Sequence, residues 1–124
     1  MPHLRERPLS YPDWAMEQTF EAYEYFQRGQ ELLTTRDFQA ASIALERAKR
    51  LEPDKASIRE ALGRAYLSSR DYRRAAAEFT AAVELAPTDH YAHFGLGRAL
   101  DRLGDTTGAK RHYKLARWFG STLV

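Results

Sequence analysis

The sequence predicts an all-α protein built from stacked helix pairs, and three observations indicate this fold. Short motifs recur along the chain at a constant spacing of 34 residues, a period typical of stacked-repeat proteins. Apolar residues recur every three or four positions, which is the spacing of a helix face and not of a strand. Proline or an Arg-Asp pair interrupts this pattern at regular intervals. Each repeat is therefore expected to be a helix, a short turn and a second helix.

Three motifs carry the period. One closes a repeat with proline, one forms its internal turn with aspartate, and one places glycine after leucine. Proline has no amide donor and clashes with the preceding helical turn, so it ends the second helix of a repeat. The motifs are Leu51-Glu52-Pro53-Asp54 with Leu85-Ala86-Pro87-Thr88, Arg36-Asp37-Phe38 with Arg70-Asp71-Tyr72 and more loosely Gly104-Asp105-Thr106, and Leu62-Gly63-Arg64-Ala65 with Leu96-Gly97-Arg98-Ala99.

The N-terminal part of the chain lies outside the repeats. Residues 1–12 include three prolines and are expected to be an irregular tail. Proline suits the first turn of a helix, so we predict that one helix runs from about 13 to 35. An apolar stripe on this helix either packs on the protein's own 1–11 tail or second helix, or docks a partner or a second copy. Its members are Met16, Phe20, Tyr23 and Phe26.

The later helices are bounded by the same signals. An Arg-Asp turn separates the two helices of a repeat, and the proline motif separates one repeat from the next. Aspartate and threonine are good N-cap residues. We therefore expect Asp54 to cap the first helix of the second repeat, and Thr88 or Asp89 to cap that of the third.

At these residues the chain resembles the tetratricopeptide repeat family, whose repeat is 34 residues long. That family places Leu-Gly among large residues on its first helix, then Ala, a large residue and Ala on its second, with a closing Pro. The matching residues are Gly29, Leu32, Ala41, Leu45, Ala48 and Pro53 in repeat 22–55, Leu62, Gly63, Tyr66, Ala75, Phe79, Ala82 and Pro87 in repeat 56–89, and Leu96, Gly97, Leu100, Ala109, Tyr113 and Ala116 in repeat 90–121.

The resemblance implies a right-handed α-solenoid of three antiparallel helix pairs with an N-terminal extension, forming one domain over 13–124. Glycine and alanine at the repeated positions are expected to let paired helices approach closely. The chain departs from the family pattern at four positions, which puts the local packing there in question. These are Arg28, Arg59, His93 and Ser121.

In that family, the first helices line a concave groove that holds a peptide or a partner helix. The resemblance therefore implies a protein–protein interaction adaptor or scaffold. Rings offer contact area at low entropy cost and arginine binds carboxylates, so we expect a partner segment with acidic and aromatic or apolar residues. In the alternative, the arginines pair with carboxylates of the chain itself, such as Arg64 with Glu60, and bind nothing specific. The implied groove residues are Tyr23, Phe26, Gln30, Glu60, Arg64, Ser68, Tyr91, Phe94, Arg98, Asp101 and Arg102.

One subclass of the family clamps the terminal carboxylates of chaperone tails with Lys, Asn and Arg at set groove positions. None of the corresponding residues here matches that set, so we do not expect chaperone-tail binding. Those positions hold Phe26, Gln30, Ala61, Tyr91 and Gly95.

The two ends of the chain suggest two alternative functions. Residues 13–35 carry five acidic residues against Arg28, which gives −4, and residues 104–124 carry four basic residues against Asp105, which gives +3. Opposite charge at the two ends suits contact between copies, so a self-assembling module is one alternative. A weak nucleic-acid binder is the other, because a basic row suits phosphates. The self-association candidates are Met16, Phe20, Trp118 and Phe119, and the basic row is Lys110, Arg111, Lys114 and Arg117.

Composition and motifs argue against chemistry. The chain has no cysteine, which excludes disulfides and thiolate sites, and it has no phosphate loop or nucleophile elbow. His90 and His93 lack a third ligand nearby, so we expect neither a metal nor a cofactor, no small-molecule substrate and no enzyme. The N-terminus has no apolar run and no segment is long enough to span a membrane, so a cytoplasmic protein is expected. The excess of arginine (15) over lysine (4) among 19 basic residues fits a bacterial source.

Overall fold

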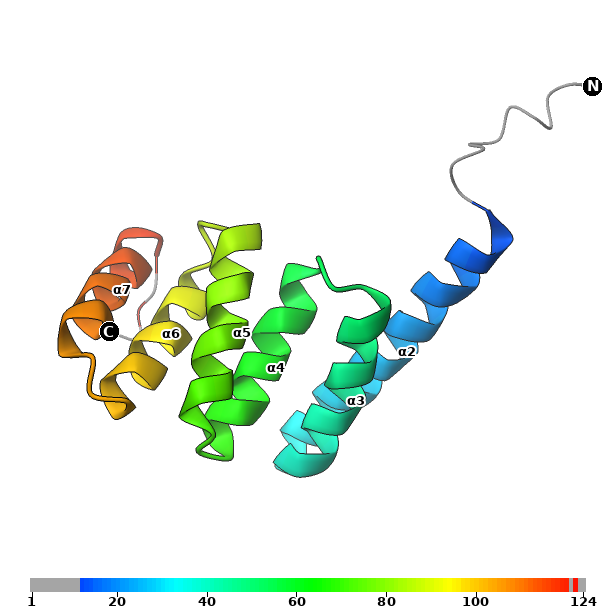
Figure 1. Cartoon of the computed structure of the whole chain (residues 1–124), viewed down its shortest axis with the longest axis horizontal. Helices are drawn as coiled ribbons and strands as arrows, with labels where there is room; N and C mark the ends of the chain where they lie inside the picture. Colours follow the sequence, from blue (N-terminus) through cyan, green and yellow to red (C-terminus); the bar gives the residue numbers. More distant parts are fainter. Residues whose placement is uncertain (1–11, 121, 123–124) are drawn as a thin grey trace, which may run out of the picture.

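The computed structural model describes residues 12–120 and 122, and within them six helices form a row of antiparallel pairs (Figure 1). This part of the chain contains no strand, which confirms the predicted all-α solenoid of three helix pairs. The predicted irregular segment lies outside the described residues except for Pro12, and so does Ser121 at the predicted end of the third repeat. The helices are α2 (Asp13–Thr34), α3 (Phe38–Leu51), α4 (Ala56–Ser68), α5 (Tyr72–Leu85), α6 (His90–Arg102) and α7 (Thr106–Trp118).

The first helix is longer than the others, as its sequence predicts. Figure 1 shows α2 at one end of the row and α7 at the other, with the first turns of α2 projecting beyond the remaining helices. None of the residues 13–21 is buried, whereas Ala22, Gly29 and Leu33 further along α2 are buried. The helices α2 and α6 both contact α4, so the three first helices of the repeats lie next to one another. None of the described helices is both long and apolar enough to cross a membrane.

The turn inside each pair has the same construction. Arg36, Arg70 and Gly104 occupy equivalent positions and adopt left-handed φ angles of 66°, 66° and 92°. Glycine adopts such an angle without steric cost, so the two arginines are strained where the third repeat is not. The aspartate that follows each of them accepts a hydrogen bond from a backbone amide and caps the next helix. These caps are Asp37 to Ala40 at 3.3 Å, Asp71 to Arg74 at 3.3 Å and Asp105 to Gly108 at 2.9 Å.

The turns between repeats are capped less uniformly. Asp89 caps α6 and accepts hydrogen bonds from the amides of Tyr91 and Ala92, so one of the two predicted alternatives is confirmed. The prediction that Asp54 caps α4 is wrong. The N-cap position is held by Lys55, which makes no side-chain cap bond. Asp54 stands one residue too early, because a capping side chain reaches the second and third amides beyond its own position.

Close approach within each pair depends on one glycine. A Cβ atom added to Gly29 would lie 2.5 Å from Leu45, one added to Gly63 would lie 2.9 Å from the ring of Phe79, and one added to Gly97 would lie 2.7 Å from Tyr113. Each of these distances is shorter than a van der Waals contact between carbon atoms. The predicted role of the repeated glycines in helix packing is therefore confirmed.

Candidate functional site

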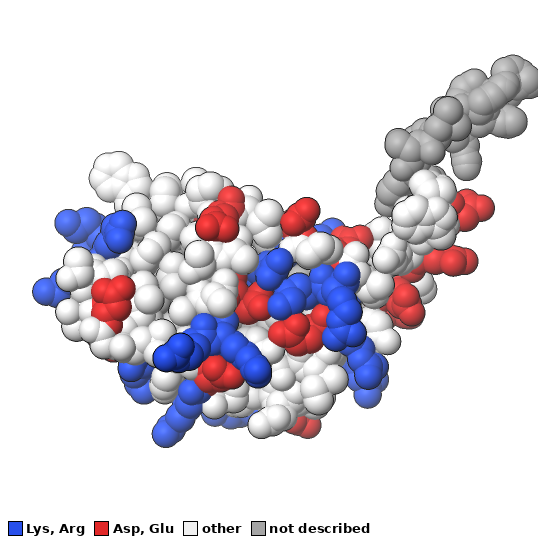
Figure 2. Space-filling view, in the orientation of Figure 1, with Lys and Arg blue, Asp and Glu red and all other residues white. Residues whose placement is uncertain are grey.

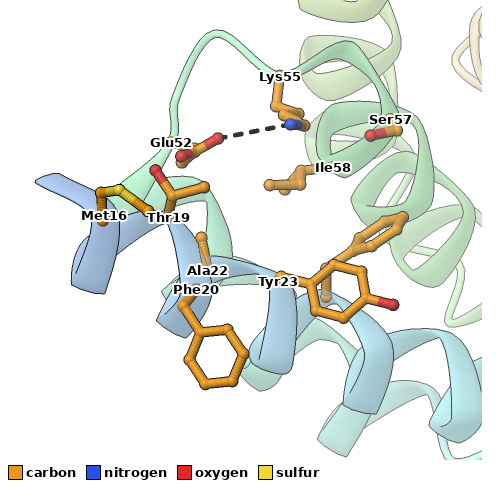
Figure 3. A pocket seen from close by; sticks show the side chains of 10 residues that line it. Met16, Thr19, Phe20, Ala22, Tyr23, Glu52, Lys55, Ser57 and Ile58 are labelled. Carbon is orange, nitrogen blue, oxygen red and sulfur yellow. Dashed lines mark ion pairs between the residues drawn. The ribbon is translucent and has the colours of Figure 1, made fainter. Parts of the chain in front are cut away.

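A pocket of about 540 Å³ opens between α2, the loop after α3 and the start of α4 (Figure 3). Figure 3 shows side chains of α2 on one side of the pocket and those of the loop and α4 on the other. An ion pair of 3.7 Å joins Lys55 Nζ to Glu52 Oε1 at the edge of the pocket. Pockets of this size with apolar walls and a few polar groups are typical binding sites. The lining residues are Met16, Thr19, Phe20, Ala22, Tyr23, Phe26, Glu52, Lys55, Ser57 and Ile58.

Three large apolar side chains on this part of α2 are open to solvent. Met16 is 55% exposed, Phe20 63% and Tyr23 56%. Met16 and Phe20 are exposed because α2 is 22 residues long and its partner α3 only 14, so the first turns of α2 extend past the end of α3. Exposed apolar side chains that adjoin one another commonly mark a contact surface. The pocket thus brings together residues predicted for the groove and residues predicted for self-association.

Five of the residues that line this pocket were not predicted from the sequence as functional residues, namely Ala22 and four others. Thr19 faces it from α2, Glu52 and Lys55 from the loop after α3, and Ile58 from α4. No local pattern distinguishes them, because their position beside α2 depends on how the second repeat packs against the first. Ile58 carries the one available signal, since it is a large apolar residue two positions after the start of a helix.

The face continues from the pocket over α4 and α6 as alternating cations and rings. The Arg64 guanidinium lies 5.7 Å from the Tyr91 ring centroid, and the Arg98 guanidinium lies 5.9 Å from that of Phe94. The two rings are 6.1 Å apart, and Tyr91 is 6.4 Å from the buried ring of Phe79. Guanidinium groups over ring faces are attracted to the ring quadrupole, so the cations and rings hold one another in place. We call Arg64, Tyr91, Phe94 and Arg98 the arginine–aromatic row.

The other predicted groove residues are less closely connected. Arg102 donates a hydrogen bond of 3.0 Å to the Tyr72 hydroxyl and lies over that ring, so it links α6 to the start of α5. Gln30 is half-buried on α2, and Ser68 and Asp101 are exposed on α4 and α6. All eleven predicted groove residues are at least partly exposed, and the structure brings six of them into the pocket or the row. Those six are Tyr23, Phe26, Arg64, Tyr91, Phe94 and Arg98.

Glu60 has a different partner from the one weighed in the sequence. No ion pair joins it to Arg64 in the described part of the chain, and its carboxyl group instead lies near that of Asp89, the N-cap of α6. Burial of Glu60, together with the nearby carboxylate of Asp89, raises the pKa of Glu60 to about 7, and Arg64 offsets this only in part. The Glu60 carboxyl group is therefore harder to ionise than that of an exposed glutamate.

This shift predicts a specific dependence of stability on pH. The folded protein binds the Glu60 proton more tightly than the unfolded chain does. The stabilisation that this proton provides is therefore lost as the pH rises from about 4.5 to about 7. Glu60→Gln removes this dependence, so the stability of the variant relative to wild type is expected to increase across that window and stay constant above it. Urea unfolding at a series of pH values measures the difference.

The matched control is Glu84→Gln, which removes a carboxylate from an exposed position on α5. The difference in the free energy of unfolding between this variant and wild type should not vary across the same pH window. If both variants show the same pH profile, Glu60 does not titrate near neutral pH in the folded protein.

Two departures from the repeat pattern turn out to make equivalent hydrogen bonds. Arg59 Nε donates to the carbonyl oxygen of Pro53 at 2.9 Å, and His93 Nε2 lies 2.8 Å from that of Pro87. The other ring nitrogen of His93 lies 3.1 Å from Nδ1 of His112. The described residues contain no group of three or more His, Cys, Asp or Glu that could hold a metal ion. Both nitrogens of His93 are thus engaged in bonds that hold the third repeat together.

The aromatic residues at the end of α7 differ in their surroundings. Trp118 is 80% exposed, as expected of a self-association residue. Phe119 is half-buried and stacks on the His93 ring at 5.7 Å between centroids. Phe119 therefore contributes to the packing of the third repeat, and its ring is only partly available to a second copy.

Comparison with known proteins identifies the repeat. The model of the tetratricopeptide repeat matches residues 26–70 and 60–117. These two matches cover most of the described helices, from the second half of α2 to the end of α7. No curated protein sequence matches the chain.

Several solved structures resemble this fold. The second TPR of Spaghetti (RPAP3), bound to the HSP90 peptide SRMEEVD, has a TM-score of 0.81 at 21% identity and covers 85% of this chain and 97% of that one. The TPR2B domain of yeast Sti1, in a complex with pHsp70, has a TM-score of 0.77 at 20% identity, with coverage of 84% and 83%. MamA has a TM-score of 0.75 at 26% identity over 82% of this chain, which spans only 59% of MamA.

Proposed function

Because the chain belongs to the tetratricopeptide repeat family, we propose that it is an adaptor that binds a segment of another protein across α2, α4 and α6. Two of the similar structures are complexes, one with an HSP90 peptide and the other with pHsp70. The observation that carries the proposal is the pocket beside α2, which adjoins exposed apolar side chains on a face that none of the described helices covers. Large exposed side chains around a hollow are typical of surfaces that bind a partner.

The pocket and the arginine–aromatic row indicate the chemistry of the segment. An apolar or aromatic side chain would fill the pocket, since its walls offer mostly carbon atoms. An acidic residue would lie against Arg64 or Arg98, whose guanidinium groups make no ion pair within the described residues. The proposed partner is therefore a segment that carries an apolar anchor and an acidic residue some distance from it.

The partners of the similar structures are not proposed for this chain. In the family's carboxylate clamp, cations or amides occupy set positions of the groove. Two of these positions hold rings in this chain: Phe26, which lines the pocket, and Tyr91, which belongs to the arginine–aromatic row. Phe26 has no hydrogen-bond donor, and the Tyr91 hydroxyl is a single uncharged donor, so these two side chains cannot replace the cations and amides that bind a terminal carboxylate. The chain's own side chains thus favour an internal segment over a carboxylate terminus.

Selection from a random peptide library on the purified protein tests this proposal. The expected result is enrichment of peptides that combine an aromatic or large apolar residue with an acidic one. A peptide from this selection is then titrated by fluorescence anisotropy against three variants. Met16→Ser with Phe20→Ser opens the pocket to water, Arg64→Ala with Arg98→Ala removes the cations, and Trp118→Ser is a matched control on the exposed surface of α7.

The pocket variant and the arginine variant are each expected to weaken binding by about tenfold or more, which corresponds to about 1.4 kcal/mol. The Trp118 control is expected to bind like wild type. The proposal fails if no peptide is enriched. It also fails if the selected peptide binds the pocket variant and the arginine variant with wild-type affinity, while circular dichroism shows that both variants are folded.

A further inference from the structure

We propose that copies of this chain associate head to tail, with the acidic outer face of α2 in one copy against the basic outer face of α7 in the next. This inference does not depend on the binding of a partner segment. It follows from the charges at the two ends of the helix row and from the way in which the repeats inside the row pack on one another.

The acidic face is a single stripe along α2. Its residues are spaced alternately by three and four positions, so they project from one side of the helix. All of them are exposed, and four carboxylates against one guanidinium give the stripe a charge of −3. None of the charged members forms an ion pair with another described residue. The stripe consists of Trp14, Glu17, Glu21, Glu24, Arg28 and Glu31.

The repeat period shows what this stripe would contact. Glu24, Arg28 and Glu31 have equivalent positions in α4 and α6, one and two repeats later. All six equivalent positions hold apolar residues, and none of these is more than 3% exposed. In α4 and α6 a preceding helix pair covers these positions, whereas α2 is the first helix of the row. The stripe is therefore the surface on which a preceding helix pair would pack. The equivalent residues are Ile58, Leu62 and Ala65 in α4, and Ala92, Leu96 and Ala99 in α6.

The basic face lies on α7, on the surface that corresponds to the one by which α3 contacts the helix pair after it. Glu46 and Lys49 of α3 bond to the following pair, since Glu46 accepts a hydrogen bond from the Tyr66 hydroxyl and Lys49 Nζ lies 2.7 Å from Glu78. The equivalent positions on α7 hold Lys114 and Arg117, both exposed. With Lys110 one turn earlier, they form a stripe of charge +3 on the surface where a following helix pair would pack.

The two faces are complementary and lie too far apart to neutralise each other within one copy. They stand at opposite ends of the row (Figure 1), and Figure 2 shows acidic side chains along the projecting part of α2 and basic ones over the α7 end. Stacking α7 of one copy on α2 of the next would repeat the relation between neighbouring pairs inside the chain. A contact between two different surfaces leads to an open row of copies, or to a ring where the rotation closes.

The strength of this contact should depend strongly on salt. Attraction between exposed charges is modest and is screened over about 10 Å at 0.1 M salt. Trp14, which is 66% exposed on the acidic face, adds apolar surface to the contact. Polar ends that merely keep a repeat protein in solution, without any association, are the competing explanation.

Sedimentation velocity over a concentration series distinguishes these explanations. At low salt, the average mass of wild type is expected to rise with concentration, and high salt is expected to return it to the monomer. Lys114→Glu with Arg117→Glu should weaken association at least about tenfold. The matched control, Arg50→Glu with Arg73→Glu, makes the same change in net charge at exposed positions of α3 and α5 and should associate like wild type.

A charge swap tests whether the two named faces meet. The variant Glu24→Lys with Glu31→Lys should by itself associate as weakly as the α7 variant does, because its α2 stripe and its α7 stripe then both carry a positive charge. A mixture of this variant with the Lys114→Glu, Arg117→Glu variant should associate again, since it restores one pair of opposite faces. A wild-type monomer at every concentration in low salt would overturn the proposal. Association of the α7 variant as strong as that of its control, or a mixture that stays monomeric, would overturn it as well.

Discussion

Replacing Phe79 with alanine is expected to lower the free energy of unfolding by about 3 to 5 kcal/mol. The Phe79 side chain is fully buried in α5, and it is the residue against which Gly63 of α4 and Gly95 of α6 pack. Its loss would leave a cavity where three helices from two repeats meet, and the backbone of the paired helices cannot move in to fill it. Urea unfolding followed by circular dichroism measures the change.

The neighbouring residue supplies the control for this prediction. Thr80→Ala removes side-chain atoms from an exposed position on the same helix and is expected to change stability by no more than about 0.5 kcal/mol. A loss below about 1 kcal/mol for Phe79→Ala would mean that the second and third repeats do not share one core. The shared core is what makes the row of helices a single folding unit.

Glu78→Ala is expected to have the next largest effect, a loss of about 2 to 3 kcal/mol. Glu78 is 6% exposed, and its two carboxylate oxygens lie 2.7 Å from Lys49 Nζ and 3.1 Å from Arg59 Nη1. Removing it leaves Arg59 partly buried without its anion, and it leaves Lys49 with Glu46 alone, 3.1 Å from its ammonium group. The loss is smaller than for a fully buried pair, because the Lys49 and Arg59 side chains keep 23% and 22% of their surface in water.

The pKa of Lys49 reflects the same arrangement. Burial alone would lower it, but the hydrogen bonds of the ammonium group to Glu78 and Glu46 offset burial, so the pKa is raised. Replacing the three buried or half-buried members together, by Lys49→Met, Arg59→Leu and Glu78→Leu, is expected to recover most of the stability, because Glu46, the one charge that loses its ion partner, still accepts a hydrogen bond from the Tyr66 hydroxyl. Equal losses in the single and triple variants would show that the packing of the Glu78 stem, and not its charge, stabilises this interface.

This cluster also explains Arg59, which departs from the expected pattern of the sequence, and the charged residue Lys49 at a packing surface. Arg59 departs from the family pattern, and Lys49 is a charge on a surface where the next repeat packs. Both are accommodated because Glu78 of α5, the partner helix of α4, bonds to Arg59 of its own pair and to Lys49 of the preceding pair. The repeat pattern identifies each position as a packing position, but it cannot show that three polar residues from α3, α4 and α5 share one interface.

The elements of the fold were largely predictable from local signals. The helix over about 13–35, the Arg-Asp turns and the glycines that face Leu45, Phe79 and Tyr113 all agree with the structure. Proline, aspartate at an N-cap and apolar spacing act through neighbours in the sequence, so they can be interpreted without coordinates. The prediction that Asp54 caps α4 failed because a shift of one residue in the helix start removes a cap completely.

The candidate site was predictable only in part. The resemblance to the repeat family indicated the positions of the arginine–aromatic row, but not that Arg64 and Arg98 lie over Tyr91 and Phe94. The pairing of Glu60 with Asp89 was not anticipated, because the two carboxyl groups are 29 residues apart and meet only through the packing of α4 on α6. Arg64 was expected as the partner of Glu60, because spacing along one helix identifies only neighbours one turn away.

The sequence by itself determined the period, the helix pairs, the turns and the identity of the packing residues. Each of these follows from interactions between residues close together in the chain, repeated every 34 residues. The tertiary structure alone decided that α2 projects past α3 to leave an apolar pocket, and that Glu78 joins two cations from other helices. It also decided that the acidic and basic stripes, whose residues are all exposed, lie at opposite ends of the row. The physical reason is that pockets, buried charges and exposed faces depend on which helices lie side by side, and local sequence does not specify this.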